Sequence, residues 1–500
     1  MHESWPTSTG AAGVDLHLDL PTGPGQGGRR AALERALRDA VRDGRLAPGA
    51  RLPSTRRLAA DTGVARGTVK AAYDQLVAEG YLDARQGSGT VVADRPGPPA
   101  AHPGDGGGPA PVPRHDLRPG SPDVTSFPTA AWMRATRRAL GAAPSAAYDY
   151  GDPRGRIELR TALAEYLGRT RGVVAEPGRI IVTSGYVQAL ALLVRVTART
   201  VAMEDPGLPF HREVVRRAGG RVVPLPTDER GARTHRLATG AAAVDAVVVT
   251  PAHQYPTGVT LHPSRRHALT AWALETGGLV VEDDYDGEFR YDRQPVGALQ
   301  GTAPDHVVYV GTASKTLGPA LRLGWMVLPP RLVAPVAEEK LHSDFHTGAL
   351  GQLTLAELIR DHGYDRQVRA GRLRYRRRRD LLVARLRGAY GTGPEGGEGG
   401  PYGLDGIAAG LHALLTLPPG EPAEAQIRRR AARLGLAVGT LGDHWHENDR
   451  PHKGGPPEQG PAHTSAAADR PQGLIIGYGT PGEGAYPAAL DALMAALTRP

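Results

Sequence analysis

The feature that most constrains the fold is an apolar, β-branched run that leads into a lysine. Residues 307–310 (Val-Val-Tyr-Val) predict a buried strand of a parallel sheet, which breaks at Gly311. Small hydroxyl residues, Lys315 and then Arg322 follow. Lysine is otherwise rare, because the 60 Lys and Arg residues include only four lysines: Lys70, Lys315, Lys340 and Lys453. Lys315 therefore indicates amine chemistry, since a lysine can form a Schiff base. A helix-capping or surface lysine is the alternative.

A second apolar run ends in carboxylates and a phenol. Residues 278–281 lead into Glu282, Asp283, Asp284 and Tyr285. In a parallel sheet both runs would end at the same edge, where ligands of such folds bind. These residue types match the needs of pyridoxal phosphate. A carboxylate can bond the ring nitrogen, a phenol the ring oxygen, and a lysine can form the imine, while hydroxyls and an arginine can hold the phosphate. Alone, the acidic cluster could be a metal site or a solvated strand end.

The composition allows two or three domains within 500 residues and excludes several classes of chemistry. The net charge of +8 favours a polyanionic partner without proving one. Cysteine is absent, so disulfides, thiolate metal sites and cysteine nucleophiles are excluded. No apolar run reaches membrane-spanning length and no leader pattern opens the chain, so we expect a cytoplasmic protein. We also expect no metal site.

The N-terminal part predicts a small helical module. After a Gly/Pro-rich arm (residues 1–28), the expected elements are helices at 29–43, 52–60 and 65–79 and a hairpin at 81–92. The exposed side of the third helix offers Arg66, Thr68 and Lys70, which suit base edges and phosphates in a major groove.

This order of elements carries a family resemblance. The motifs Gly44-Arg45-Leu46, Leu52-Pro53-Ser54, Glu79-Gly80-Tyr81-Leu82 and Gly87-Ser88-Gly89-Thr90 resemble the winged helix of GntR-type regulators. The resemblance implies that residues 29–93 bind double-stranded operator DNA through Arg56, Arg66, Thr68, Lys70 and the wing-tip Gly87. Gly67 departs from the hydroxyl residue usual in the family, which removes a phosphate hydrogen bond.

A Pro/Gly-rich linker at 94–115 precedes a second globular part at 116–500. Its alternating strand and helix patterns predict a mostly parallel α/β domain. One strand at 180–183 is followed by a turn at Gly185 and the start of a helix, a geometry that presents backbone N–H groups to an anion.

Several motifs make this part similar to fold-type I aminotransferases, and the multidomain chain to the MocR subfamily of GntR regulators. They are Tyr150-Gly151-Asp152-Pro153-Arg154-Gly155, Glu282-Asp283-Asp284-Tyr285-Asp286 and Ser314-Lys315-Thr316-Leu317 with Leu321-Arg322-Leu323-Gly324. The resemblance implies that Lys315 carries the Schiff base of pyridoxal phosphate, Asp283 bonds the pyridinium nitrogen and Tyr285 the ring oxygen. It also implies a homodimer and a set of phosphate-binding residues: Gly185, Tyr186, Val187, Thr312, Ser314, Arg322 and, from a second subunit, Tyr150.

Three positions depart from the aminotransferase pattern. Leu208 stands where an aromatic residue usually stacks on the cofactor, so either cofactor binding is weaker or the nearby Phe210 covers the loss. Residues 253–258 (His-Gln-Tyr-Pro-Thr-Gly) replace an Asn-Pro-Thr-Gly turn. Leu474 and Ile475 occupy the region of the arginine that clamps a substrate carboxylate.

Two further stretches have less specific patterns. Residues 370–387 form a very basic helix, for which we expect a solvated face with an apolar seam, the alternative being an auxiliary DNA contact. Residues 441–472 contain His444, His446, His452 and His463 at irregular spacing, which predicts a disordered insert rather than a metal site.

These features favour a transcription regulator whose aminotransferase-like domain senses pyridoxal phosphate or an amine, with control of vitamin B6 metabolism as one outcome. The missing carboxylate arginine favours the vitamin itself as the signal. An active aminotransferase with a DNA-binding appendage is the alternative. A cofactor-free dimeriser of the DNA-binding modules would require Lys315 to be incidental.

Overall fold

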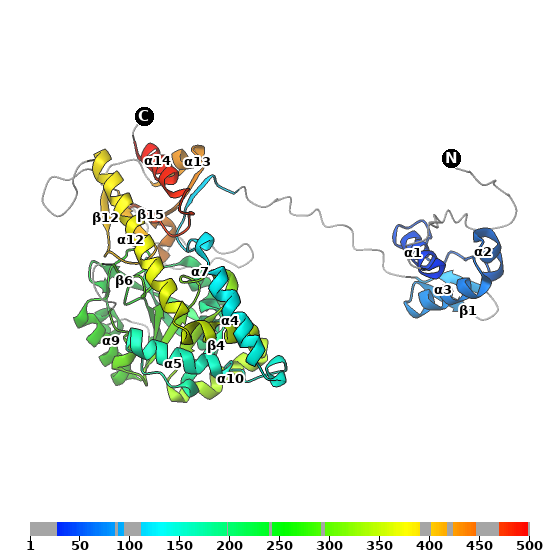
Figure 1. Cartoon of the computed structure of the whole chain (residues 1–500), viewed down its shortest axis with the longest axis horizontal. Coiled ribbons are helices and arrows are strands. Elements are labelled where there is room, and N and C mark those ends of the chain that lie inside the picture. Colours follow the sequence, from blue (N-terminus) through cyan, green and yellow to red (C-terminus); the bar gives the residue numbers. More distant parts are fainter. Residues whose placement is uncertain are drawn as a thin grey trace. The chain divides into compact units, whose positions relative to one another are not determined.

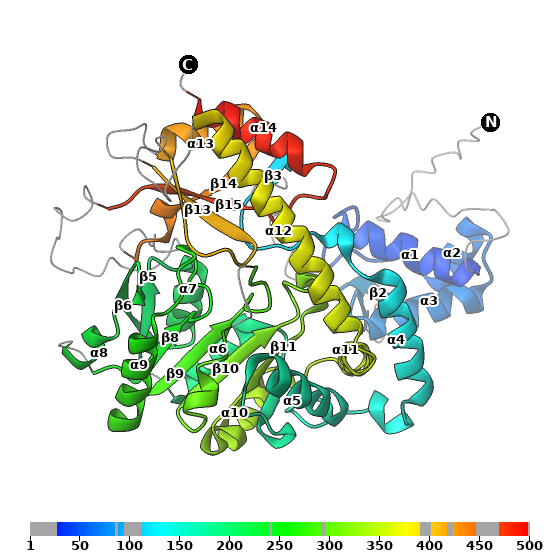
Figure 2. The ribbon, with the colours of Figure 1, turned by 60° about the vertical axis from the view of Figure 1, so that its left-hand side comes forward.

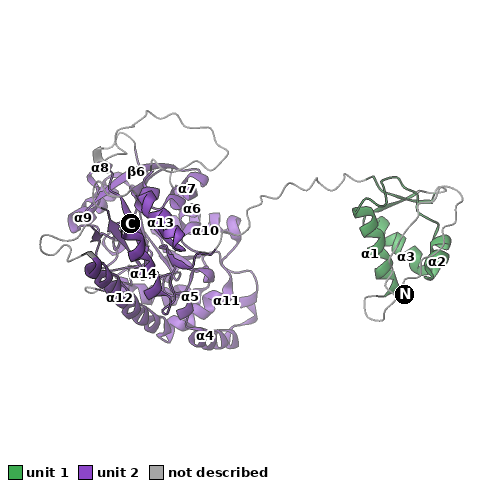
Figure 3. Ribbon diagram, turned by 90° about the horizontal axis from the view of Figure 1, so that it is seen from above, with its two compact units in different colours: residues 1–111 green, residues 112–500 purple. Residues whose placement is uncertain are grey.

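The structure is a computed structural model that describes residues 28–85, 89–94, 112–197, 199–239, 243–291, 296–390, 402–417, 424–446 and 470–498. The chain divides into two compact units, residues 1–111 and 112–500 (Figure 3). Among the described residues, no helix is long and apolar enough to cross a membrane.

The described residues of the first unit form three helices and a two-stranded hairpin (Figure 1). They are α1 (Arg29–Arg42), α2 (Thr55–Thr62), α3 (Arg66–Ala78), β1 (Leu82–Arg85) and β2 (Gly89–Val92). Leu33, Leu37, Val69 and Leu76 form the centre of its core. The layout confirms the predicted winged helix-turn-helix.

The second helix begins later than the sequence pattern predicts. We expected a start at Leu52, but α2 begins at Thr55 because Ser54 is its N-cap: the Ser54 hydroxyl accepts a hydrogen bond from the Arg57 N–H at 3.2 Å. At its other end Gly63 adopts φ 65°, a left-handed conformation that favours glycine and turns the chain toward α3.

An eight-stranded sheet forms the centre of the second unit and confirms the predicted α/β fold. Its order is β4 (Ile180–Thr183), β11 (Gly324–Val327), β10 (Val307–Thr312), β9 (Leu279–Asp284), β8 (Ala246–Val249), β5 (Thr200–Asp205), β6 (Arg221–Asp228) and β7 (Gly231–Ala232). The strands from β10 to β6 are parallel, and β4, β11 and β7 pair antiparallel.

Helices cover both faces of this sheet, because side chains of buried strands alternate between faces. Ile180 and Val182 of β4 pack in one apolar cluster with residues of α5 and α11, whereas Ile181 packs in another with residues of α6 and α10. The helices are α4 (Thr129–Ala142), α5 (Ile157–Arg171), α6 (Tyr186–Thr197), α7 (Pro209–Arg217), α8 (His235–Thr239), α9 (Pro263–Thr276), α10 (Pro330–Asp344) and α11 (Ala349–Arg360).

A smaller five-stranded sheet completes the second unit (Figure 2). Its order is β12 (Gly403–Asp405), β13 (His412–Thr416), β15 (Gly473–Gly477), β14 (Leu436–Thr440) and β3 (His115–Leu117), and its helices are α12 (Gly363–Tyr390), α13 (Glu424–Arg433) and α14 (Tyr486–Leu497). β3 begins at His115, one residue inside the predicted linker, because it pairs with β14. Residues 95–111 of that linker lie outside the described residues.

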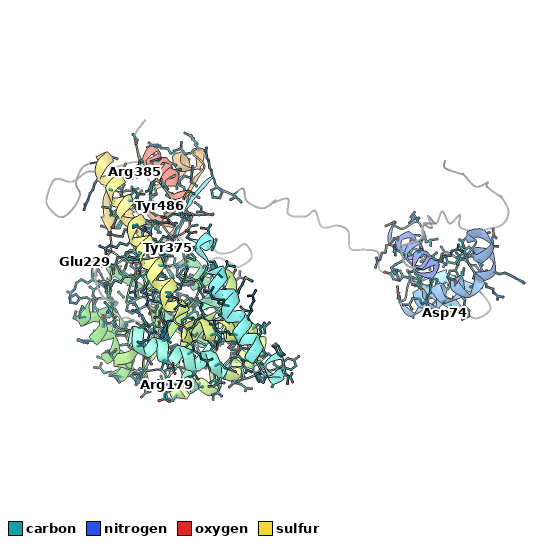
Figure 4. The ribbon with its side chains drawn as sticks, viewed as in Figure 1. Asp74, Arg179, Glu229, Tyr375, Arg385 and Tyr486 are labelled. Atoms are coloured by element: carbon teal, nitrogen blue, oxygen red, sulfur yellow. The ribbon has the colours of Figure 1, made fainter. Side chains whose placement is uncertain are left out.

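The basic helix α12 is not simply a solvated face with an apolar seam. Arg378 is 3% exposed, and its Nη2 lies 2.7 Å from Asp123 and 3.0 Å from Glu483. Leu373, which we expected in the seam, is 62% exposed. Tyr375 on α12 and Tyr486 on α14, both labelled in Figure 4, are buried beside this ion pair.

The predicted disordered insert is wrong at its start. Residues 441–446 are ordered, with a short 3-10 helix η6 (Leu441–His444) that contacts the larger sheet domain. The His444 carbonyl accepts from the Gly207 N–H at 3.0 Å, and the His446 N–H donates to Asp205 at 2.9 Å. Residues 447–469, including His452 and His463, lie outside the described residues.

Candidate functional site

A cavity of ≈ 360 Å³ opens at the ends of the parallel strands of the second unit. Its volume lies within the range of small-molecule sites, about 300–1,000 Å³. Nine of the ten predicted cofactor residues line it: Lys315, Asp283, Tyr285, Arg322, Thr312, Ser314, Gly185, Tyr186 and Val187. They come from three separate stretches of sequence, which the sheet brings together because β9 and β10 are parallel neighbours.

Lys315 follows β10 and lines the cavity. Its Nζ donates a hydrogen bond to the carbonyl oxygen of Gly120, which lies just after β3. Burial lowers the pKa of this amine, while the charges of Asp286 and Asp283 raise it; the net effect is a lower pKa. A lower pKa favours the neutral amine that a Schiff base requires.

Asp283 is the penultimate residue of β9, lies opposite Val310 of β10 and is 6% exposed. Burial, followed by the charge of Asp284, raises the pKa of the Asp283 carboxyl well above its usual range, and Lys315 opposes this shift. A buried carboxylate with little compensation favours a cationic or protonated partner.

Asp284 points away from the cavity into a buried ion pair. Its two carboxylate oxygens accept from Arg171 at 2.7 and 2.9 Å, and the Tyr309 hydroxyl donates to it at 2.7 Å. Both charged side chains are 1% exposed. The pair therefore holds a neutralised acidic residue directly beside Asp283 on the strand.

Tyr285 is positioned by His253, which belongs to the 253–258 turn that differs from the aminotransferase pattern. Its hydroxyl lies 3.2 Å from His253 Nδ1, which in turn lies 2.9 Å from an oxygen of Asp286. The His253 and Asp286 side chains are buried, at 2% and 1% exposure. The phenol is thereby held at the cavity wall by a histidine that is itself fixed by a carboxylate.

The predicted phosphate residues form a compact cradle. Gly185 adopts φ 122°, and a Cβ there would lie 3.3 Å from the Arg322 guanidinium, so glycine allows this close approach. Thr312 donates to Ser314 at 2.9 Å, and the Ser314 N–H donates back to the Thr312 hydroxyl at 3.1 Å.

A buried lysine supports the cradle from behind. Lys340 is fully buried and donates to Asp344 at 2.7 Å and to Gln188 at 3.3 Å. Gln188 accepts from the Ser184 N–H at 2.8 Å, so the network fixes the turn before α6. Lys340 was not predicted to have this role, although the rarity of lysine is a signal that could have indicated one.

Tyr150 does not line the cavity of its own chain. It is 78% exposed and contacts only the neighbouring ring of Phe345, at 5.0 Å between centroids, among the ring contacts of the described residues. The expected contribution of Tyr150 to a site in a second subunit stays a prediction.

Of the two possibilities for the missing aromatic residue, replacement by Phe210 is wrong. Phe210 is 58% exposed and lies outside the cavity, whereas His211 lines it and packs on the Tyr186 ring at 4.5 Å between centroids. Both residues lie in α7, which begins at Pro209, and consecutive helical residues point in different directions. Burial, Lys315 and Arg212 lower the pKa of His211 to about 3, so its ring is neutral.

An apolar cluster occupies the region of the carboxylate clamp. Ile475 in β15 is fully buried with Leu414 and Leu441, and Trp445 packs against them. Arg470 lies over the Trp445 ring at 5.0 Å from its centroid. The strand position itself therefore offers no cation to a ligand carboxylate.

Sequence reasoning missed several other lining residues: Glu204, Arg212, Tyr255, Leu411 and His412. Arg212 is 1% exposed, and it donates to the carbonyl oxygens of Gly207 and His444 at 3.0 and 3.1 Å. Tyr255 lies 3.1 Å from His444 Nε2. These contacts join the cavity to η6 of the smaller sheet domain.

One group of potential metal ligands occurs among the described residues. His253, Asp286 and His412 have ligand atoms within 4.8 Å of one another. The hydrogen bond between His253 and Asp286 already satisfies two of these side chains. We assign no metal to the group, and the expected absence of a metal site stays a prediction.

The predicted DNA-contacting residues lie on the first unit. Arg56, Arg66 and Lys70 are exposed and Thr68 is half-buried. Lys70 forms an ion pair at 2.7 Å with Asp74, which is labelled in Figure 4. The Tyr73 hydroxyl donates to the Pro53 carbonyl at 3.0 Å, which ties α3 to the start of α2. Gly87 lies outside the described residues.

The cavity residues fit pyridoxal phosphate by their own chemistry. The buried Asp283 carboxylate suits a protonated ring nitrogen, Lys315 has a lowered pKa, and Arg322 stands beside the glycine turn before α6.

The buried carboxyl group of Glu204, which also lines the cavity, allows a test of how strongly burial shifts pKa values there. Burial raises its pKa to about 7, although the Thr250 hydroxyl and N–H donate to it at 2.5 and 3.2 Å. The folded state thus keeps a proton that the unfolded state releases near pH 4.5, and the associated stability is lost as the pH rises through about 7. When the pH rises from 5 to 8, the free energy of unfolding should therefore decrease in the native protein. We expect this decrease to be about 2 kcal/mol smaller in Glu204→Gln, which has no carboxyl to ionise.

Urea unfolding of the two cofactor-free proteins at several pH values measures this difference. Glu282 and Glu288, whose pKa values are also raised to about 7 by burial, titrate in both proteins and cancel. Parallel pH profiles would show that Glu204 is ionised without cost.

Comparisons with known proteins agree with both units. Residues 29–92 match the family of bacterial regulatory proteins of the gntR family, and residues 117–410 match aminotransferase class I and II. The chain is 33% identical to the HTH-type pyridoxine biosynthesis transcriptional regulator PdxR of Corynebacterium glutamicum, over 83% of this chain and 88% of that protein.

Two further similarities cover most of the chain. It is 34% identical to the probable rhizopine catabolism regulatory protein MocR of Rhizobium meliloti, over 71% of this chain and 76% of that protein. The structure of LysN, an α-aminoadipate aminotransferase of Thermus thermophilus, covers 76% of this chain and 91% of its own at 24% identity and a TM-score of 0.63.

Proposed function

Because the chain belongs to the MocR-type GntR transcription regulators, with an aminotransferase class I and II domain, we propose that this domain is a sensor whose ligand state changes DNA binding. Its cofactor is pyridoxal phosphate. The observation that carries the proposal is the convergence of nine cofactor-type residues on one cavity. The absence of a cation at Ile475 argues against the alternative of an amino-acid transaminase.

The cavity residues have separate tasks in this proposal. Pyridoxal phosphate supplies an aldehyde that condenses with an amine. Lys315 supplies the amine, Asp283 keeps the ring nitrogen protonated, and Tyr285 holds the ring oxygen. Arg322, Thr312, Ser314 and the backbone around Gly185 hold the phosphate.

The remaining assignments complete the proposal. Residues 29–93 would bind an operator, 94–115 would link this module to 116–500, and the protein would act in the cytoplasm. A homodimer is supported by two exposed aromatic side chains that contact each other, Tyr150 and Phe345. Control of vitamin B6 metabolism is supported by the similarity to the pyridoxine biosynthesis regulator.

Binding of the full-length protein to its own upstream DNA, with and without pyridoxal phosphate, tests the sensor. Salt must be constant, because phosphate contacts make the affinity depend steeply on ionic strength. We expect the cofactor to change the affinity or the footprint, since a ligand shifts an equilibrium only when it binds the two states differently. Specific binding that is indifferent to the cofactor would reject the sensor.

Arg66→Ala is expected to weaken DNA binding about tenfold or more, because this exposed arginine begins the helix α3 that would enter the major groove. Arg35→Ala, an exposed arginine on α1, is the matched control and should change the affinity far less. Equal losses in the two variants would place the DNA elsewhere on this module. Fluorescence anisotropy with labelled upstream DNA measures both.

The same assay can detect a gain. A Cβ on Gly67 would meet no atom within 4 Å, so a serine fits there without displacing a neighbour. We expect Gly67→Ser to bind DNA more tightly, because it adds a hydroxyl donor and removes a glycine from the helix. Unchanged binding would show that DNA does not approach this position.

A further inference from the structure

The cavity has a second wall that the cofactor residues do not account for. It includes Tyr255, Leu411 and His412, the last of these from β13 of the smaller sheet. His412 is 4% exposed, and its Nε2 has no hydrogen-bond partner among the residues that the structure describes. A buried polar atom without a partner costs about 1–3 kcal/mol, so a ligand is expected to satisfy it.

The other nitrogen of the ring fixes what Nε2 can do. The backbone of Pro256 raises the pKa of His412, and since proline has no N–H, this effect is that of its carbonyl oxygen on a ring N–H. In a neutral imidazole the remaining nitrogen is then an acceptor. Burial and the neighbouring His253 lower the pKa of His412 well below 6.5, which agrees with a neutral ring.

The ring also has a fixed position. It lies between Tyr255 and His253, at centroid distances of 5.0 and 4.9 Å. The Tyr255 hydroxyl forms a hydrogen bond with His444, and His253 forms one with Asp286. The acceptor nitrogen is therefore part of a rigid, buried array.

We propose that His412 Nε2 accepts a hydrogen bond from a hydroxyl or amine of a second small ligand, so that the effector of this regulator is an amine bearing a further donor, such as an amino alcohol, rather than an amino acid. A carboxylate offers only acceptors and would face the acceptor nitrogen unfavourably. Ile475 occupies the strand region of the usual carboxylate clamp and is buried in an apolar cluster, so this position supplies no cation. This inference rests on the sensor function proposed above.

Three matched amines test the ligand class in the cofactor-loaded, full-length protein. Ethanolamine carries a hydroxyl, propylamine a methyl group of similar size, and β-alanine a carboxylate. The readout is the absorbance change of bound pyridoxal phosphate as each amine is titrated, normalised to the cofactor bound. We expect ethanolamine to reach half-saturation at a concentration at least tenfold lower than the other two.

His412→Leu should remove the advantage of ethanolamine over propylamine, and His412→Gln should restore part of it because its amide oxygen is an acceptor. The proposal is overturned if ethanolamine keeps its advantage in His412→Leu, or if no amine changes the absorbance of the loaded protein. It is also overturned if β-alanine saturates first and loses this lead in Arg212→Leu, which would place a carboxylate on Arg212.

Cofactor loading and DNA binding are measured on the same preparations. A protein that binds no pyridoxal phosphate, or whose DNA binding ignores it, would reject the sensor function. An intact cofactor response without a preference for ethanolamine would reject only the ligand class.

Discussion

Lys315→Ala is expected to lose all pyridoxal phosphate that borohydride can fix to the protein, and with it the effect of the cofactor on DNA binding. Lys315 is the only lysine that lines the described cavity. Its lowered pKa, caused by burial, prepares the amine for condensation at neutral pH. Noncovalent contacts of Asp283 and Arg322 with the cofactor would remain. We therefore expect the affinity for pyridoxal phosphate to fall by more than tenfold without being lost completely.

Because lysine is rare in this chain, the lysine that carries the reduced adduct can be assigned without ambiguity. The native protein has only three other lysines, so mass mapping of the reduced adduct can exclude each of them. Lys70→Ala is the matched control, because Lys70 is an exposed lysine of the first unit and should leave the adduct intact. A reduced adduct at Lys340 or a cofactor effect that persists in Lys315→Ala would contradict the assignment.

Local patterns were sufficient to predict the residues at the strand ends. Two apolar runs, each ending in polar residues, place Asp283 and Lys315 at one sheet edge because buried parallel strands have few other arrangements. The pairing of Val310 with Asp283 realises this expectation. The positions of the helices in the first unit were predictable for the same reason, apart from the start that Ser54 determines.

Residues that depend on distant partners could not be predicted. A row of arginines in α12 does not reveal that Arg378 is buried, because Asp123 and Glu483 lie far from it in sequence. His412 reaches the cavity from a different sheet, and its unpaired nitrogen is a property of packing. Residue type indicated Phe210 as the possible ring partner of the cofactor, whereas the packing of α7 places His211 at the cavity.

The ion pair behind the cofactor site was also missed, and its loss has the second large expected effect. Arg171→Leu should lower the free energy of unfolding by about 3–5 kcal/mol, because it leaves the Asp284 carboxylate buried without a cation. It should also weaken cofactor binding. Asp284 already raises the pKa of Asp283, and without Arg171 its charge would oppose ionisation of that carboxyl more strongly.

Arg169→Leu provides the control on the same helix. Arg169 pairs with Asp365 at 3.0 Å but is 54% exposed, so its loss should cost less than about 1 kcal/mol. The double variant Arg171→Leu with Asp284→Leu should recover most of the stability, because removing both charges removes the uncompensated one. Urea unfolding and a pyridoxal phosphate titration distinguish the two roles of the pair. If the double variant is stable yet binds the cofactor weakly, Asp284 orients Asp283 directly; if it is stable and binds normally, the pair serves only to neutralise a buried charge.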